Sequence, residues 1–172
     1  MGRRPDILGE FTAEHRAVED LLARIEAGAA GPEAGAEAGT DAGTEAGTDA
    51  GAEQDRLLGR LTDLLFSHCA AEEEHLFPVV QHDVPDGGAI VFRCIHDHLA
   101  IGQYLADLQA LPPGDPALDT LLRGLAELLR RHLATEEEQL FAAARKALPA
   151  AARNALAERL RADRAEIAEA GP

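Results

Sequence analysis

The sequence predicts an all-α protein, an up-down-up-down four-helix bundle built from two repeated helical hairpins and followed by a C-terminal helix. Three observations support this fold class. Apolar residues are mainly Leu and Ala, while Val, Ile and Thr are too few to fill a sheet. Apolar positions recur at alternating spacings of three and four, as on the buried face of a helix. The same hairpin also occurs twice, and two amphipathic hairpins can bury their apolar faces only against each other.

The chain length favours one domain, because 172 residues are enough for one substantial core but not for two. We expect the bundle to span residues 1–148 and an accessory helix to span residues 149–172. Pro149 can begin that last helix, whose apolar positions are Leu156, Leu160 and Ile167. This helix is expected to pack across one end of the bundle.

Capping residues and segments rich in Gly and Pro indicate where the four helices of the bundle begin and end. Asp6 can cap the first helix, and segments rich in Gly and Pro follow the first three helices. Pro78 lies in the last turns of the second helix and predicts a kink or an early end near Phe77. The expected helices are at about residues 6–27, 54–82, 89–110 and 116–146.

Residues 28–52 form an acidic segment, rich in Ala, Gly and Glu, between the first two helices. The segment cycles through four-residue units that contain Gly, and it has no large apolar residue. Each Gly inside a helix costs about 1 kcal/mol relative to Ala, and nothing here offsets the entropy of ordering the backbone. We therefore expect a flexible insertion, whose function the sequence leaves open.

Two segments of the chain are copies of each other. Residues 57–77 and 121–141 share 12 identical residues of 21 at a constant offset of 64. The first and third helices align at an offset of 83, which matches Glu14-His15 with Asp97-His98. The bundle should therefore have a pseudo-twofold axis, with matching residues at matching heights.

Histidine and glutamate interrupt the apolar face of each helix at these matching heights. His68 and Glu72 are four residues apart, as are their repeat mates His132 and Glu136, so each pair shares one helix face. Each of the other two helices carries one His at a core position. The candidate metal ligands are His15, His68, Glu72, His98, His132 and Glu136.

Six polar groups in one buried layer indicate a metal site. A single His at a core position is usually a hydrogen-bonded core residue. Six polar groups in one layer, however, would each cost several kcal/mol without partners or a metal. Imidazole and carboxylate ligands without thiolate suit iron, with zinc and manganese ranking behind it. One Glu from each half is placed to bridge two ions, so we expect a di-metal centre.

Other residues near the repeated motif receive different interpretations. The acidic residues that follow each candidate Glu ligand point away from the ligand face and are expected on a solvated surface: Glu73, Glu74, Glu137 and Glu138. His75 is on the ligand face three residues after Glu72, so it is either a fifth imidazole ligand or a hydrogen-bonding neighbour. Cys94 replaces Phe11 of the first copy, and we interpret it as a small core thiol while a redox role stays open.

The net charge of −15 argues against two classes of partner. A surface this acidic repels nucleic-acid phosphates and anionic membranes. Cys69 and Cys94 are expected to be free and reduced. No signal-peptide pattern and no run of about 18 apolar residues is present, so the expected compartment is the cytoplasm. The sequence leaves the oligomeric state open.

The pattern resembles the hemerythrin-like, or HHE-type, cation-binding family. The motif of that family is a His on one helix followed by HxxxE on the next, and it occurs here twice over about residues 6–146: Glu14-His15 with His68 to Glu72, and Asp97-His98 with His132 to Glu136. The resemblance implies a bundle that holds two iron ions in an oxo- or hydroxo-bridged non-haem centre, with the two Glu as bridges.

The resemblance is to the more symmetric HHE type rather than to oxygen-carrying hemerythrin, which has a His where this chain has Cys94, four residues before His98. It implies a protein that binds or reacts with dioxygen, peroxide or nitric oxide, in oxidative-stress defence or sensing. A catalase-like or peroxide-reducing activity stays open. The alternative is a non-catalytic iron or oxygen sensor, or a metal-storing binding module.

Overall fold

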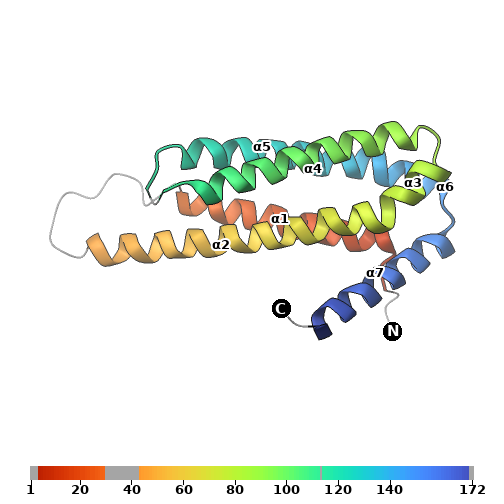
Figure 1. Ribbon diagram of the computed structural model, residues 1–172, viewed down its shortest axis with the longest axis horizontal. Helices are drawn as coiled ribbons and strands as arrows, with labels where there is room; N and C mark the ends of the chain where they lie inside the picture. Colours follow the sequence, from red (N-terminus) through yellow and green to blue (C-terminus); the bar gives the residue numbers. More distant parts are fainter. Residues whose placement is uncertain (1–3, 30–42, 113, 171–172) are drawn as a thin grey trace.

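The computed structural model describes residues 4–29, 43–112 and 114–170, and every regular element in these ranges is helical. Four long helices form an antiparallel bundle of two hairpins, the first made of α1 and α2 and the second of α4 and α5 (Figure 1). The bounds of these helices are Ile7–Ala29, Gly43–Ala71, Gly87–Ala110 and Leu118–Thr135, respectively. The predicted all-α bundle of two hairpins is confirmed.

The second helix of each hairpin contains a π turn that begins at its candidate Glu ligand. These helices continue beyond α2 as η1 (Glu72–Leu76) and α3 (Phe77–Asp83), and beyond α5 as η2 (Glu136–Phe141) and α6 (Ala142–Ala147). The irregularity predicted near Phe77 thus takes the form of a π turn just before Pro78. Proline is not its cause, because Ala142 stands at the equivalent place after η2. Such turns are frequently found at functional sites.

The structure differs from the sequence prediction at the start of α2. Residues 43–52, which we assigned to the flexible insertion, form the first turns of α2. Extending a helix that the bundle has already nucleated adds a backbone hydrogen bond per residue, and this gain offsets the modest cost of Gly. Glu53 also pairs with Arg56 at 2.6 Å and with Arg24 of α1 at 3.4 Å. Residues 30–42 of the expected insertion lie outside the described residues.

The turn between α3 and α4 depends on a glycine. Asp86 has a left-handed backbone conformation with a φ of 59°. A Cβ atom at the next residue, Gly87, would collide with the backbone carbonyl of Val80. Gly87 therefore permits the close approach of α3 and α4 that starts the second hairpin.

The buried apolar residues form two clusters, with the candidate ligands between them. One cluster, toward α3 and α6, includes Phe11 and Phe141. The other, toward the opposite end of the bundle, includes Val18 and Leu129. His15 lies between Phe11 and Val18 on α1 and is fully buried. Close-packed apolar side chains therefore shield the polar layer from water on both sides.

The accessory helix α7 (Ala150–Ala170) lies obliquely against α1 and η1 at the end of the bundle that carries α3 and α6 (Figure 1). Leu156 and Leu160 are buried in the core, as expected. The expectation that Ile167 continues this apolar face is wrong, because Ile167 is 73% exposed. Residues 165–169 of α7 are all exposed, so its last turns lie clear of the bundle.

Ion pairs hold α7 along α1. Three arginines of α7 each meet an acidic residue on α1 or at its cap, at 2.5–2.7 Å: Arg153 with Asp6, Arg161 with Glu10 and Arg164 with Glu14. The third pair lies beside the candidate ligands, as described below.

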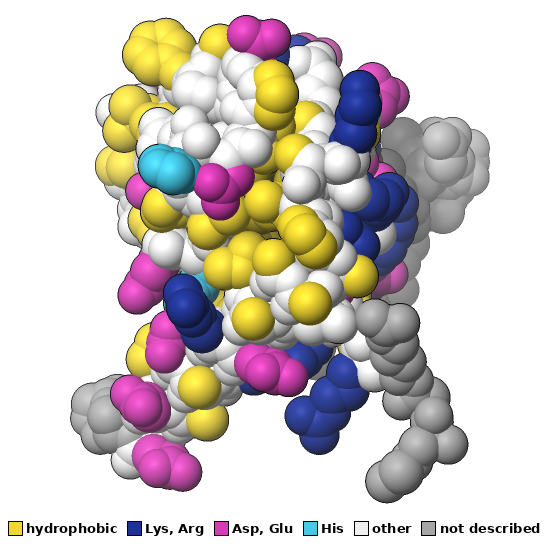
Figure 2. Space-filling view, turned by 90° about the vertical axis from the view of Figure 1, so that its right-hand side faces the viewer, with side chains coloured by type: hydrophobic (Ala, Val, Ile, Leu, Met, Phe, Trp, Pro, Cys, Tyr) yellow, Lys and Arg dark blue, Asp and Glu magenta, His cyan; other side chains and the backbone are white. Residues whose placement is uncertain are grey.

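The surface at the α3, α6 and α7 end is mixed in character. Hydrophobic side chains gather in the middle of this face, and Lys and Arg side chains line one side of it (Figure 2). None of the described helices combines the length and the apolar composition needed to span a membrane.

Candidate metal centre

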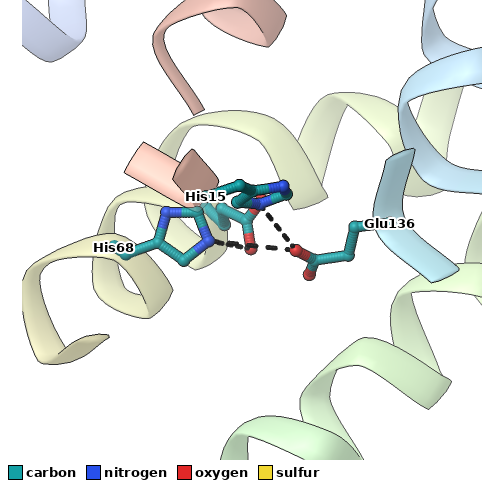
Figure 3. A group of neighbouring side chains, drawn as sticks. His15, His68 and Glu136 are labelled. Carbon is teal, nitrogen blue, oxygen red and sulfur yellow. Dashed lines mark ion pairs between the residues drawn. The ribbon is translucent and has the colours of Figure 1, made fainter. Parts of the chain in front are cut away.

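The structure brings the six candidate ligands into one layer, where each is at most 8% exposed. The ligands come from six elements: His15 from α1, His68 from α2, Glu72 from η1, His98 from α4, His132 from α5 and Glu136 from η2. In Figure 3, His15, His68 and Glu136 point toward one another from three of these elements.

The ligand atoms form two groups that share both carboxylates. His15 and His68 with Glu72 and Glu136 form one group, which we call the first metal position. His98 and His132 with the same two Glu form the other group, the second metal position. Within each group the ligand atoms lie within 4.8 Å of one another.

The distances leave room for an ion at each position. Glu136 Oε2 lies 3.3 Å from His15 Nε2, and Glu136 Oε1 lies 3.3 Å from His132 Nε2. Glu72 Oε2 lies 3.7 Å from His68 Nε2 and 3.5 Å from His98 Nε2. Two ligand atoms at right angles, each about 2.1 Å from one ion, are about 3 Å apart. Glu136 thus presents one oxygen to each position, as a bridging carboxylate does.

The atoms that face the centre are unpaired. The Nε2 atoms of all four His and both oxygens of both Glu are buried without a hydrogen-bond partner among the described residues. A buried polar atom left unpaired costs about 1–3 kcal/mol, and native proteins rarely leave one. Lone pairs of imidazole nitrogen and carboxylate oxygen converging in this way fit a metal cation.

Four acidic side chains, which we call the outer carboxylates, lie around this layer: Glu14, Glu73, Asp97 and Glu137. Three histidines donate a hydrogen bond from Nδ1 to one of them at 2.8–2.9 Å: His15 to Glu137, His68 to Glu14 and His98 to Glu73. A histidine that donates from Nδ1 keeps its lone pair on Nε2, the atom that faces the centre. The fourth pair is looser, because His132 Nδ1 lies 3.7 Å from Asp97.

The sequence interpretation missed the outer carboxylates. Glu74 and Glu138 are exposed, as expected of a solvated surface. Glu73 is exposed as well and Glu137 is half-buried, but each reaches a histidine on a helix of the other hairpin. Their occurrence in both repeats was the available signal, and the helix on which each would find its histidine was not visible without the packing.

Aromatic rings pack on three of the ligand histidines. Phe77 stacks on His98 with ring centroids 5.4 Å apart, and its repeat mate Phe141 stacks on His15 at 5.2 Å. Phe11 meets His68 edge to face at 5.4 Å. These contacts hold the imidazole planes between the ligand layer and the apolar core.

His75 does not point into the ligand layer. Its Nε2 atom lies 3.3 Å from Asp163 of α7, and its side chain is 8% exposed. A π turn winds each residue through less than the 100° of an α-helix, so the residue three after Glu72 is carried further from the ligand face. Of the two alternatives for His75, the fifth imidazole ligand is therefore not supported, and His75 instead contacts the accessory helix.

The two carboxylates differ in acidity. Burial and the neighbouring charge of Glu136 raise the pKa of Glu72 to about 7. Burial opposes ionisation of Glu136 as well, but the imidazoles of His15, His68 and His98 that face its carboxylate hold its pKa well below the usual range. Burial lowers the pKa of His132 to about 4. Two buried carboxylates with oxygens within 4.8 Å of each other ionise together readily only when cations neutralise them.

A cavity of about 440 Å³ lies between α2 and α4 beside the second metal position. His98, Cys69 and Glu73 contribute to its lining, which is otherwise mainly apolar. Cys69 is half-buried and Cys94 is buried, and neither forms a disulfide within the described residues. Burial raises the pKa of Cys94 to about 12, so this thiol is not ionised near neutral pH.

Comparisons with known proteins agree with this geometry. A family model described as the hemerythrin HHE cation binding domain matches residues 6–144. A DNA nickase of Nostoc sp. (strain PCC 7120 / SAG 25.82 / UTEX 2576) is 28% identical over 112 residues, which are 64% of this chain and 31% of the nickase. The chain thus spans about a third of the length of that relative. No solved structure matches significantly. Because the family model covers both copies of the motif, the chain belongs to the hemerythrin HHE cation-binding domain family.

Proposed function

We propose that the chain is a non-haem di-iron protein that binds or reacts with dioxygen, peroxide or nitric oxide in oxidative-stress defence or sensing. The observation that carries the proposal is the set of buried, unpaired nitrogen and oxygen atoms arranged as two positions with two shared carboxylates. Four carboxylate oxygens and four imidazole nitrogens without a thiolate favour iron over softer ions. Zinc and manganese are the competing ions.

Each metal position offers two His and two Glu, so an ion of six-fold coordination keeps sites for a small molecule. Iron ions bound there supply inner-sphere binding of the small molecule together with one-electron chemistry at each ion. The oxo or hydroxo bridge between the ions is part of this proposal.

The residues of the chain hold the protons and exclude water. The outer carboxylates keep the proton of His15, His68 and His98 on Nδ1, so that Nε2 remains a ligand. Phe77 and Phe141 cover imidazole faces and separate the layer from solvent. The cavity beside His98 offers a mainly apolar path to the second metal position, which suits small uncharged molecules.

Metal loading tests the assignment. We expect about two irons per chain after anaerobic reconstitution with Fe²⁺, as in other di-iron bundles. His68→Ala and His132→Ala should each lose iron. His96→Ala is the matched control, since His96 is an exposed histidine on α4 outside both ligand groups. Full iron content in the two ligand variants, or one iron or fewer in the native chain, would rule the di-iron centre out.

Spectroscopy and turnover separate the candidate functions. Charge-transfer absorption that changes with oxygen, peroxide or nitric oxide supports the di-iron assignment, whereas a zinc site shows no such absorption in air. Catalytic removal of peroxide supports an enzyme. Metal-dependent folding without turnover supports the sensor or the metal-storing module.

The activity named for the Nostoc relative is not proposed for this chain. The match covers 31% of that nickase, and a net charge of −15 repels phosphate backbones. The two unpaired cysteines suit a reducing compartment, so we propose that the protein works in the cytoplasm.

A further inference from the structure

We propose that the two metal positions are not equivalent: Arg164 of the accessory helix stabilises the first metal position through Glu14, and the ion at the second position exchanges faster. This inference rests on the proposed di-metal centre. It concerns the surroundings of the ligands, because the ligands themselves are the same by type in both positions.

The outer carboxylates of the first metal position are each held by an arginine. Glu14, which accepts the hydrogen bond from His68, lies 2.6 Å from Arg164 Nη1 and is 15% exposed. Glu137, which accepts from His15, lies 3.2 Å from Arg16. Both carboxylates are therefore fixed from two sides, and both histidines of this position are completely buried.

The equivalent residues of the second metal position have less support from arginine. Asp97, the repeat mate of Glu14, is one methylene shorter and lies 3.7 Å from His132 Nδ1, which has no hydrogen-bond partner in the described part of the chain. The arginine nearest to Asp97 is Arg131, at 3.6 Å, compared with 3.2 Å between Arg16 and Glu137 and 2.6 Å between Arg164 and Glu14. Glu73, which holds His98, is 49% exposed and forms no ion pair with a described arginine or lysine.

Packing follows the same asymmetry. Phe11 packs against His68, whereas its repeat mate is the smaller Cys94. The 440 Å³ cavity has His98 in its lining and reaches none of the first-position histidines. The second position is therefore both less supported and closer to solvent.

Two effects of Arg164 on a metal ion oppose each other. Its positive charge disfavours a cation, but Glu14 and the His68 imidazole lie between the two charges and the Arg164 side chain is one-third exposed, so solvent screens this repulsion. Its fixing of Glu14 favours the cation, because outer hydrogen bonds to ligating histidines typically change metal affinity by about 10–100-fold. The positioning effect should dominate.

Release of Fe²⁺ to a chromogenic chelator under anaerobic conditions tests the inference. We expect two phases of one ion each, with rates that differ by about 10-fold or more. Arg164→Ala should accelerate the slow phase by several-fold and leave the fast phase unchanged. Arg164→Lys should restore part of the difference, because Lys keeps the charge without the fork geometry.

Two further variants make the test specific. Arg161→Ala breaks the neighbouring ion pair of α7 with α1, at Glu10, and should leave both phases unchanged. Asp97→Glu gives the second position the longer carboxylate that Glu14 supplies to the first, and should slow the fast phase. A change in the docking of α7 would not by itself slow the release of iron from the second position.

The outcomes separate this inference from the proposed function. Two ions released in one phase by the native protein would overturn the inequivalence and leave the di-iron proposal standing. Equal effects of Arg161→Ala and Arg164→Ala would overturn the role of Arg164. One bound ion or fewer per chain would overturn the proposed function itself.

Discussion

Among single residues, Glu73 gives a direct test of the outer carboxylates. Glu73 and the adjacent Glu74 are both exposed, but only Glu73 accepts a hydrogen bond from a ligand histidine, His98 Nδ1, at 2.8 Å. We expect Glu73→Ala to weaken metal binding by about 10–100-fold, because the imidazole loses the partner that fixes its tautomer and orientation. Isothermal titration of the metal-free protein with Fe²⁺ under anaerobic conditions measures this change.

Glu74→Ala is the matched control, since it removes the same charge one residue away. Its affinity for Fe²⁺ should stay within about 2-fold of the native value, as expected of a solvated surface charge. Equal losses in the two variants would mean that Glu73 acts by its charge alone and not through His98.

The sequence reveals the inner residues of the site more readily than the outer ones. His68 and Glu72 share one helix face, so spacing alone brings them together. Glu14 and Glu73 act on histidines 54 and 25 residues away along the chain. Contacts of that kind depend on how helices are rotated against each other, which the hydrophobic pattern does not specify at the level of single side chains.

At the level of helices, Asp6 has two functions at the start of α1. Its Oδ1 atom accepts a hydrogen bond from the Gly9 backbone, and its Oδ2 atom lies 2.7 Å from Arg153 Nε of α7. Asp6→Ala should cost about 1–2 kcal/mol of unfolding free energy, because it removes the cap as well as the ion pair. Asp6→Asn keeps the cap and should cost less than about 1 kcal/mol.

The pH dependence of this difference follows from the pKa of Asp6. Burial raises it, but the hydrogen bonds from Arg153 and Gly9 outweigh burial and lower it below the ordinary value of 3.8. A carboxylate whose pKa is lower in the folded state than in the unfolded state stabilises the fold at pH values above its unfolded-state pKa. This contribution is lost as the pH falls through its folded-state pKa. Urea unfolding from pH 7 downward should therefore show the gap between the native chain and Asp6→Asn closing below about pH 4. A gap that is constant with pH would contradict the ion pair.

The cavity between α2 and α4 can be filled at Gly102. This residue is part of its lining, and a Cβ atom there would meet nothing within 4 Å. Gly102→Leu should slow the reaction of Cys69 with an uncharged maleimide by several-fold in the metal-free protein, because the new side chain occupies the path to the thiol. Stability should not fall, since Leu is a better helix former than Gly by about 0.8 kcal/mol.

Gly88→Leu supplies the control, because Gly88 lies on the same helix with open space around it and outside the cavity. Mass spectrometry of the labelled thiols measures both variants, and Cys94 serves as an internal reference because it is buried. Equal labelling rates in the two variants would show that Cys69 is reached by another path.

The π turns in the second helix of each hairpin could not be predicted from the sequence. Pro78 suggested a kink near Phe77, but the second copy forms its own π turn before Ala142. The shared feature is the buried Glu at the first residue of each turn. A hydrophobic pattern distinguishes a helix from a strand, but it does not distinguish an α turn from a π turn.

For the whole molecule, most of the fold prediction depended on the internal repeat of the helical hairpin. Two copies at offsets of 64 and 83 imply two similar hairpins, and burying both apolar faces leaves a four-helix bundle as the simplest arrangement. The accessory helix was the least well predicted part. Its weak apolar face ends at Leu160, and three ion pairs with α1 or its cap complete its attachment. Such pairs depend on the crossing angle of two helices, which no local pattern encodes.

The buried polar layer makes the stability of the whole bundle depend on metal. In the metal-free protein four imidazoles and two carboxylates occupy the core without partners for their inward atoms, which opposes folding. Metal that binds the folded chain and not the unfolded one should raise the unfolding free energy by about 4 kcal/mol when its free concentration is 1,000 times Kd. Anaerobic urea unfolding with and without Fe²⁺ measures the difference. In the double variant His68→Ala/His132→Ala, Fe²⁺ should add less than about 1 kcal/mol, because each position keeps only one imidazole. A native chain that is equally stable with and without metal would mean that other groups or water satisfy the buried layer, and the unpaired atoms would then give no support to a metal centre.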